Sequence, residues 1–101
     1  MIWIVTCLDK KDALPRRLAN IDAHRAYLKT APIKTLLSGP LVADDGETMK
    51  GSFFMVEAER RDDVLAFHEA DPLKHADVWE TVIIEAFFKR VDNLSGAGAA
   101  A

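Results

Sequence analysis

Three side chains of this sequence, a histidine, an arginine and an aspartate, could together transfer a proton. His24 and Arg17 lie seven residues apart in a segment with helical periodicity, so at about 100° per residue they point within roughly 20° of each other. An imidazole beside an apolar helix stripe can act as a general base, and a neighbouring guanidinium can hold a carboxylate or a phenolate. The same pattern also fits an ordinary amphipathic helix with a boundary histidine and a surface arginine.

Asp71 supplies the carboxylate of this group. It precedes Pro72 at the end of a second predicted helix, which would lie beside the first on one face of a sheet. A carboxylate in contact with His24 would select one tautomer of the imidazole and stabilise the imidazolium, as the acid of a hydrolytic triad does. We therefore predict a hydrogen bond between a His24 ring nitrogen and Asp71. The alternative is that Asp71-Pro72 only stops a helix.

Two further polar residues are candidates for the same cleft. Ser52 follows Gly51 at the start of a predicted strand and could donate a hydrogen bond to a substrate, although a Gly-Ser turn explains it equally well. His75 lies four residues after Asp71, so His24, Asp71 and His75 could instead form a metal site. The sequence contains no G-x-G-x-x-G, P-loop, G-x-S-x-G or H-E-x-x-H motif. We therefore expect no cofactor and no metal, and assign catalysis to His24 and Asp71 and substrate binding to Arg17 and Ser52.

Six elements must position these side chains. Apolar periodicity, turn residues and helix-stop signals delimit each of them. Asp12 is the expected N-cap of the first helix, whose apolar stripe is Leu14, Leu18, Ile21 and Leu28. In the second helix we expect Val64, Leu65 and Phe67 to face the core, with His68 either facing inward beside them or packing at the helix edge. The predicted elements are a strand at 2–8, a helix at 12–29, strands at 33–43 and 49–58, a helix at 59–70, and a strand at 81–88.

This β-α-β-β-α-β order is typical of a ferredoxin-like α+β fold, in which a four-stranded antiparallel sheet carries two helices on one face. A sheet with one solvated face shows apolar and polar residues in alternation. The first and last strands are instead apolar at both parities, as Trp3 beside Ile4 and Ile83 beside Ile84 illustrate. We therefore expect the open sheet face to be covered by a second copy of the chain, in a homodimer.

Composition limits the remaining possibilities. The 101 residues suit one domain, which we place at residues 1–93, followed by a flexible tail at 94–101. The net charge of −3 argues against nucleic-acid binding. The chain has one cysteine, Cys7, which we expect to be buried and inert, and it has neither a signal-peptide pattern nor a membrane-spanning apolar run. We expect a cytoplasmic protein that does not contact membranes.

Several short motifs together resemble the YCII-related family over residues 1–91. They are RRLANIDAHRAYL, LLSGPLVADDG, KGSFFMVEAE and FHEADPLKHADVWETVIIEAFFKRV. The resemblance implies a ferredoxin-like fold that dimerises into an α+β barrel, with a His–Asp pair in a cleft that corresponds to His24 and Asp71. One relative is a dehydrochlorinase that acts on a chlorinated hydroxyquinol. The sequence departs from the family at Leu73, where an aromatic residue is usual, and at Asp77, where glycine is usual.

These observations support two hypotheses of different classes. In the first, the protein is an enzyme in which His24 and Asp71 act as general acid and base on a small polar organic substrate, in lyase or isomerase chemistry that could resemble dehydrochlorination. In the second, it is a non-catalytic dimeric module that binds a small ligand or a protein. Contact between His24 and Asp71 in an open cleft would favour the enzyme. A cleft filled by Leu73 or Tyr27 would favour the module.

Overall fold

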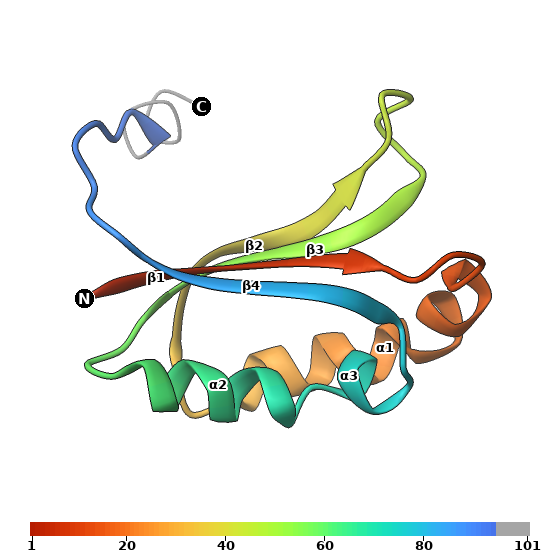
Figure 1. Ribbon diagram of the computed structural model, residues 1–101, viewed down its shortest axis with the longest axis horizontal. Helices are drawn as coiled ribbons and strands as arrows, with labels where there is room; N and C mark the ends of the chain where they lie inside the picture. The colour runs from red at the N-terminus through yellow and green to blue at the C-terminus, as the bar shows by residue number, and fades with distance from the viewer. Residues whose placement is uncertain (95–101) are drawn as a thin grey trace.

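A computed structural model of the chain describes residues 1–94 as one sheet with three helices beneath it (Figure 1). The predicted tail at 94–101 lies, apart from Leu94, outside the described residues. The elements are β1 (Ile2–Asp9), α1 (Leu14–Thr30), β2 (Lys34–Val42), β3 (Met49–Glu57), α2 (Arg61–Glu69), α3 (Pro72–His75) and β4 (Trp79–Phe87). No helix within residues 1–94 is long and apolar enough to cross a membrane.

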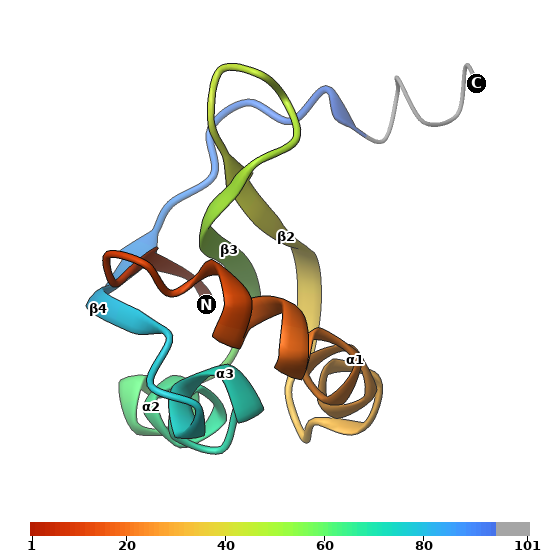
Figure 2. The ribbon, with the colours of Figure 1, turned by 90° about the vertical axis from the view of Figure 1, so that its right-hand side faces the viewer.

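The sheet has the order β2-β3-β1-β4, and every neighbouring pair is antiparallel. The expected ferredoxin-like α+β fold is therefore confirmed. Viewed from the end, α1 lies side by side with α2 and α3 under the same face of the sheet (Figure 2). The opposite face carries none of the three helices.

The core fills the space between the sheet and the helices. Alternate residues of β1 and β3 point into it, because side chains of a strand alternate between the two faces. On the helical side, Val64, Phe67 and Leu73 close the core. The strand residues buried there are Trp3, Val5, Cys7, Phe54, Val56, Trp79 and Ile84.

The first helix faces the sheet with a different side from the one its sequence predicts. Of its predicted apolar stripe, Leu14, Ile21 and Leu28 are only half-buried, and the Leu18 side chain is 51% exposed. Arg17 and His24 are buried instead. This orientation places both basic side chains against carboxylates that lie below the sheet. The predicted N-cap is also wrong: Asp12 has a left-handed backbone with φ of 60°, and Ala13 occupies the cap position without a side-chain hydrogen bond.

Two expectations for the second helical segment are also corrected. Leu65 is 42% exposed, whereas Val64, Phe67 and His68 form the buried face at helical spacing. Asp71-Pro72 does more than end a helix, because it begins the third helix, α3, which the sequence analysis missed. Proline at the first helical position and aspartate at the N-cap are favourable for such a start.

Candidate active site

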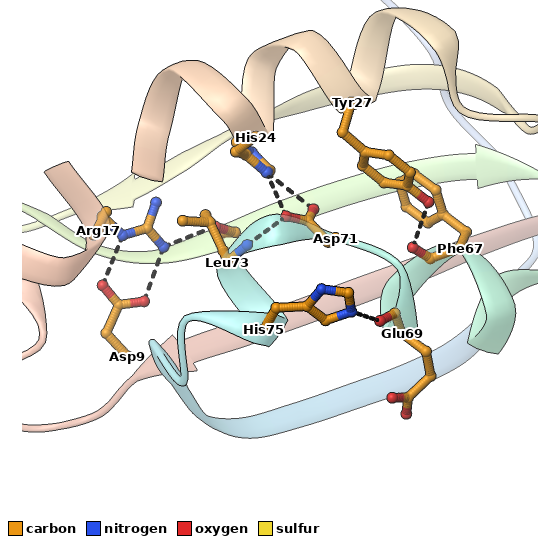
Figure 3. Close-up of polar contacts among 10 residues, drawn as sticks. Asp9, Arg17, His24, Tyr27, Phe67, Glu69, Asp71, Leu73 and His75 are labelled. Atoms are coloured by element: carbon orange, nitrogen blue, oxygen red, sulfur yellow. Dashed lines mark hydrogen bonds and ion pairs between the residues drawn. The ribbon is translucent and has the colours of Figure 1, made fainter. Parts of the chain in front are cut away.

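The predicted contact between His24 and Asp71 is present in the structure (Figure 3). Nδ1 of His24 lies 2.8 Å from Oδ1 and 2.9 Å from Oδ2 of Asp71. A carboxylate only accepts hydrogen bonds, so Nδ1 carries the hydrogen and donates it, which leaves the lone pair on Nε2. Phe54 packs edge-on against the imidazole, with ring centroids 6.0 Å apart. The histidine is therefore held in one orientation and one tautomer.

Asp71 is itself fixed by the backbone that follows it. Its Oδ1 accepts a hydrogen bond of 2.9 Å from the Leu73 backbone N–H, which makes Asp71 the N-cap of α3. Asp71 is 1% exposed and Leu73 is fully buried. The short helix α3 therefore aims a carboxylate at α1 from inside the core. Leu73, one of the two departures from the family pattern, packs in that core.

Arg17 lies on the same side of α1 as His24 but makes different contacts. Its Nε and Nη2 donate to the two carboxylate oxygens of Asp9 at 2.7 and 2.8 Å, in a pair that is almost fully buried. Nη2 also donates to the Ser52 hydroxyl at 2.8 Å. Asp9 therefore occupies the Nε–Nη2 fork of Arg17 inside the protein, and the role of Arg17 in substrate binding stays a prediction.

Gly51 allows Ser52 to reach this position. A Cβ atom on Gly51 would overlap the backbone oxygen of Cys7 on the neighbouring strand. Only glycine permits β3 to approach β1 this closely, and the next residue, Ser52, then meets Arg17 below the sheet.

A cavity of about 210 Å³ lies between α1 and the β2–β3 hairpin. Its volume exceeds the roughly 150 Å³ of an engineered cavity that accepts benzene. Its lining includes the polar residues Arg17, His24, Arg25, Ser38 and Ser52. The apolar lining residues are Ile21, Leu28, Pro40, Met49 and Phe54. A flat organic molecule with polar substituents fits such a lining.

The other histidines and Tyr27 lie outside this cavity lining. The exposed His75 donates from Nε2 to the Glu69 carbonyl at 2.9 Å, and Tyr27 donates its hydroxyl to the Phe67 carbonyl at 2.8 Å. His68 is buried and stacks on Trp79, and burial lowers its pKa. Within residues 1–94 no cluster of three or more His, Cys, Asp or Glu side chains is arranged to hold a metal ion. The His24–Asp71–His75 metal alternative thus has no geometric support.

Cys7 lies close to both carboxylates but is fully buried. Burial, reinforced by the negative charge of Asp71, raises the pKa of its thiol to about 12. A thiol in this state is a poor nucleophile at neutral pH. Cys7 therefore belongs to the core, as its sequence context predicts.

Asp9 and the apolar cavity wall were missed by the sequence analysis. Asp9 comes directly after the apolar run of the first strand, where an acidic residue commonly marks a turn. Its spacing of eight residues from Arg17 crosses a loop, so no periodicity relates the two. Pro40 and Met49 of the wall lie on different strands, and only strand pairing brings them to one cavity.

Comparison with known protein families agrees with this architecture. The family model described as YCII-related domain matches residues 1–88. The protein YciI of Escherichia coli O6:H1 is 31% identical over 96 residues, covering 88% of this chain and 98% of the relative. The YciI protein of Shigella flexneri matches to the same extent.

Similarity in both fold and sequence also extends to a solved structure. It is 5-chloro-2-hydroxyhydroquinone dehydrochlorinase (TftG) from Burkholderia phenoliruptrix AC1100, in complex with 2,5-dihydroxybenzoquinone. The two structures superpose with a TM-score of 0.79 at 33% sequence identity, over 87% of this chain and 94% of the other.

Proposed function

Because this chain belongs to the YCII-related domain family, we propose that it is an enzyme in which His24 and Asp71 act as a general acid–base pair on a small hydroxylated substrate. The observation that carries the proposal is the buried His24–Asp71 hydrogen bond beside an open cavity. Neither Leu73 nor Tyr27 lines that cavity, which favours the enzyme hypothesis over a filled cleft.

The proposed reaction starts with proton transfer to Nε2 of His24. The Asp71 carboxylate stabilises the imidazolium that forms, because it accepts the hydrogen bond from Nδ1. The electron pair left on the substrate can move through a ring or an enol system. A carbon of that system then takes the proton back from His24, which completes an isomerisation. Where that carbon carries chlorine, it is now tetrahedral, and removal of a further hydroxyl proton by His24 forms a second C=O bond, breaks the C–Cl bond and completes an elimination of HCl.

We propose a hydroxylated six-membered ring as the substrate class. TftG acts on a chlorinated hydroxyhydroquinone and its structure holds a dihydroxybenzoquinone, which is a flat ring with several oxygen substituents. The cavity beside His24 has the volume and the mainly apolar wall that such a ring requires. Elimination of HCl from the ring needs no oxidant and no cofactor.

We also propose that the enzyme is a homodimer formed through the sheet face opposite the helices. Leu8, Leu37, Ile83 and Phe87 are each between 37% and 47% exposed on the strands. Four strands about 4.8 Å apart and about 30 Å long present roughly 570 Å² of flat area, which is of the order of a standard interface of about 800 Å² per partner. A single buried thiol suits a reducing compartment, so we propose a cytoplasmic location.

A direct test combines ligand binding with chloride release. The purified protein is incubated with 2,5-dihydroxybenzoquinone in a thermal-shift titration, and with 5-chloro-2-hydroxyhydroquinone in a chloride-release assay. We expect a raised melting temperature in the first assay and one chloride per substrate in the second. The substitution His24→Gln should lower the rate by about 10²-fold or more, because it removes the base.

His75→Gln is the matched control, since it changes an exposed histidine whose one hydrogen bond within residues 1–94 is to the Glu69 backbone. This variant should retain the parent's rate. Binding without any turnover would reject the enzyme and support the alternative, a non-catalytic module that binds a small ligand. A His24→Gln variant as fast as the parent would reject the assigned base.

A further inference from the structure

The Ser52 hydroxyl has one hydrogen that its neighbours leave unused. Its oxygen accepts a hydrogen bond from Nη2 of Arg17 at 2.8 Å. Within residues 1–94 this hydroxyl donates to no acceptor, although Ser52 is only 2% exposed. Ser52 lines the same cavity as His24. Its hydrogen is therefore available to a molecule bound in that cavity.

Arg17 determines how Ser52 can act. A guanidinium has no acceptor, so Ser52 can only accept from Arg17 and must direct its own hydrogen elsewhere. A hydroxyl that accepts a charge-assisted hydrogen bond is polarised and becomes a stronger donor. The Ser52 hydroxyl can thus donate a strong hydrogen bond to a negatively charged atom.

Asp9 holds the Arg17 guanidinium in the orientation in which it donates to Ser52. Its carboxylate binds Nε and Nη2 at 2.7 and 2.8 Å, which leaves Nη1 as the one Arg17 nitrogen without a partner among residues 1–94. In Figure 3 the Arg17 nitrogen that bears no dashed line is turned away from Asp9. A free arginine fork would bind both oxygens of a carboxylate. Here the Asp9 carboxylate already occupies the Nε–Nη2 fork of Arg17.

We propose that Asp9, Arg17 and Ser52 form an oxyanion-binding relay, in which Ser52 donates to a single anionic oxygen of the ligand and Asp9 is the positioning residue. The inference rests on the proposed function, because it supplies the group that stabilises the charge left after His24 removes a proton. The relay selects ligands whose charge is on one oxygen, phenolates and enolates, over carboxylates, which require the fork that Asp9 occupies.

The test uses two chromophoric probes of similar size, 4-nitrophenol and 4-nitrobenzoate. Binding of each probe is measured by absorbance titration, and the ionised fraction of bound 4-nitrophenol is measured across pH. We expect the parent to bind 4-nitrophenol as phenolate, at a lower pH than in free solution, and to bind 4-nitrobenzoate more weakly. Ser52→Ala should weaken phenolate binding by about 10-fold or more, because a hydrogen bond to a charged group is lost.

Two more variants separate the relay from a general structural role. Ser52→Thr retains the hydroxyl and should restore the ionised state of the bound probe. Asp9→Asn keeps the shape of the side chain but releases the Arg17 fork, so the preference for 4-nitrophenol over 4-nitrobenzoate should fall by about threefold or more. The melting temperature of each variant is measured alongside, and Ser52→Ala decides the result if Asp9→Asn does not fold.

The outcomes distinguish this inference from the proposed function. A parent protein that does not bind 4-nitrophenol, or a Ser52→Ala variant that binds the phenolate as the parent does, would overturn the relay. If His24→Gln still abolishes chloride release while Ser52→Ala changes nothing, the proposed function stands without the relay. If neither residue affects binding or turnover, both proposals are wrong.

Discussion

At the scale of single residues, the site consists of two buried basic side chains on one helix, each with its own carboxylate. Arg17 meets Asp9, and His24 meets Asp71. Burying a charged or polar side chain is costly unless a partner satisfies its hydrogen-bond donors, so each carboxylate stabilises the buried position of its basic partner. The two pairs differ in one respect that bears on chemistry: the arginine is a fixed donor, whereas the histidine can both accept and return a proton.

Asp71 has two roles that substitution can separate. Asp71→Ala removes the N-cap of α3 and the acceptor of His24 Nδ1, so we expect the free energy of unfolding to fall by about 2–4 kcal/mol. Asp71→Asn retains an oxygen for the Leu73 N–H and should be about 1 kcal/mol more stable than the alanine variant. Both should lose chloride release. Urea denaturation followed by circular dichroism measures the difference, and equal stability of the two variants would contradict the capping role.

At the scale of elements, the short loop between α3 and β4 depends on an unusual backbone conformation at one residue. The loop between α3 and β4 contains Asp77, whose backbone φ is 59°, a left-handed conformation. The resemblance to the family implies glycine at this position, and glycine adopts this conformation without strain. Aspartate tolerates it better than most residues. Here its carboxylate also binds Lys10 Nζ at 2.6 Å, which lowers the Asp77 pKa.

We predict that this backbone conformation, rather than the ion pair, determines which residues position 77 accepts. Asp77→Gly should change the melting temperature by less than about 4 °C, because relief of strain offsets the loss of an exposed ion pair. Asp77→Val should lower the melting temperature by roughly 5–10 °C, since a β-branched residue is strained at positive φ. Differential scanning calorimetry provides the comparison. A glycine variant as unstable as the valine variant would mean that the Lys10 contact dominates.

At the scale of the whole molecule, the arrangement is one-sided. The helices α1, α2 and α3 lie under one face of the sheet (Figure 1). The opposite face exposes apolar side chains from the strands, Leu8, Leu37, Ile83 and Phe87 among them. Exposed apolar patches of this kind mark interaction surfaces. The candidate active site lies on the helical side, so the proposed dimer would cover the other face without filling the cavity.

Light scattering at micromolar concentration should therefore give about twice the chain mass of 11.2 kDa. Ile83→Lys places a charge on the exposed sheet face, where Ile83 is 47% exposed, and should shift the protein to the monomer. Leu65→Lys is the matched control, because Leu65 is 42% exposed on α2 in the helical layer and should leave the dimer intact. A monomeric parent protein would reject the proposed interface.

Much of this architecture could be predicted from the sequence because it depends on local periodicity. Alternation of side chains and turn residues located all four strands, and the order of elements restricted the topology to a ferredoxin-like sheet. The contact between His24 and Asp71 also followed, since that topology brings both helical segments to one face. Each of these inferences uses either neighbours along the chain or a general rule of connection.

Only the tertiary structure decided which side of the first helix is buried. Hydrophobic periodicity favoured burial of the leucine stripe. In the structure Arg17 and His24 are buried instead, because the carboxylates of Asp9 and Asp71 lie within hydrogen-bond distance of them. The Asp9–Arg17–Ser52 contacts join β1, α1 and β3, and the spacing of these residues in the sequence does not predict that they are in contact. A buried charge is stable only with its partner in place, and that partner is supplied by the fold.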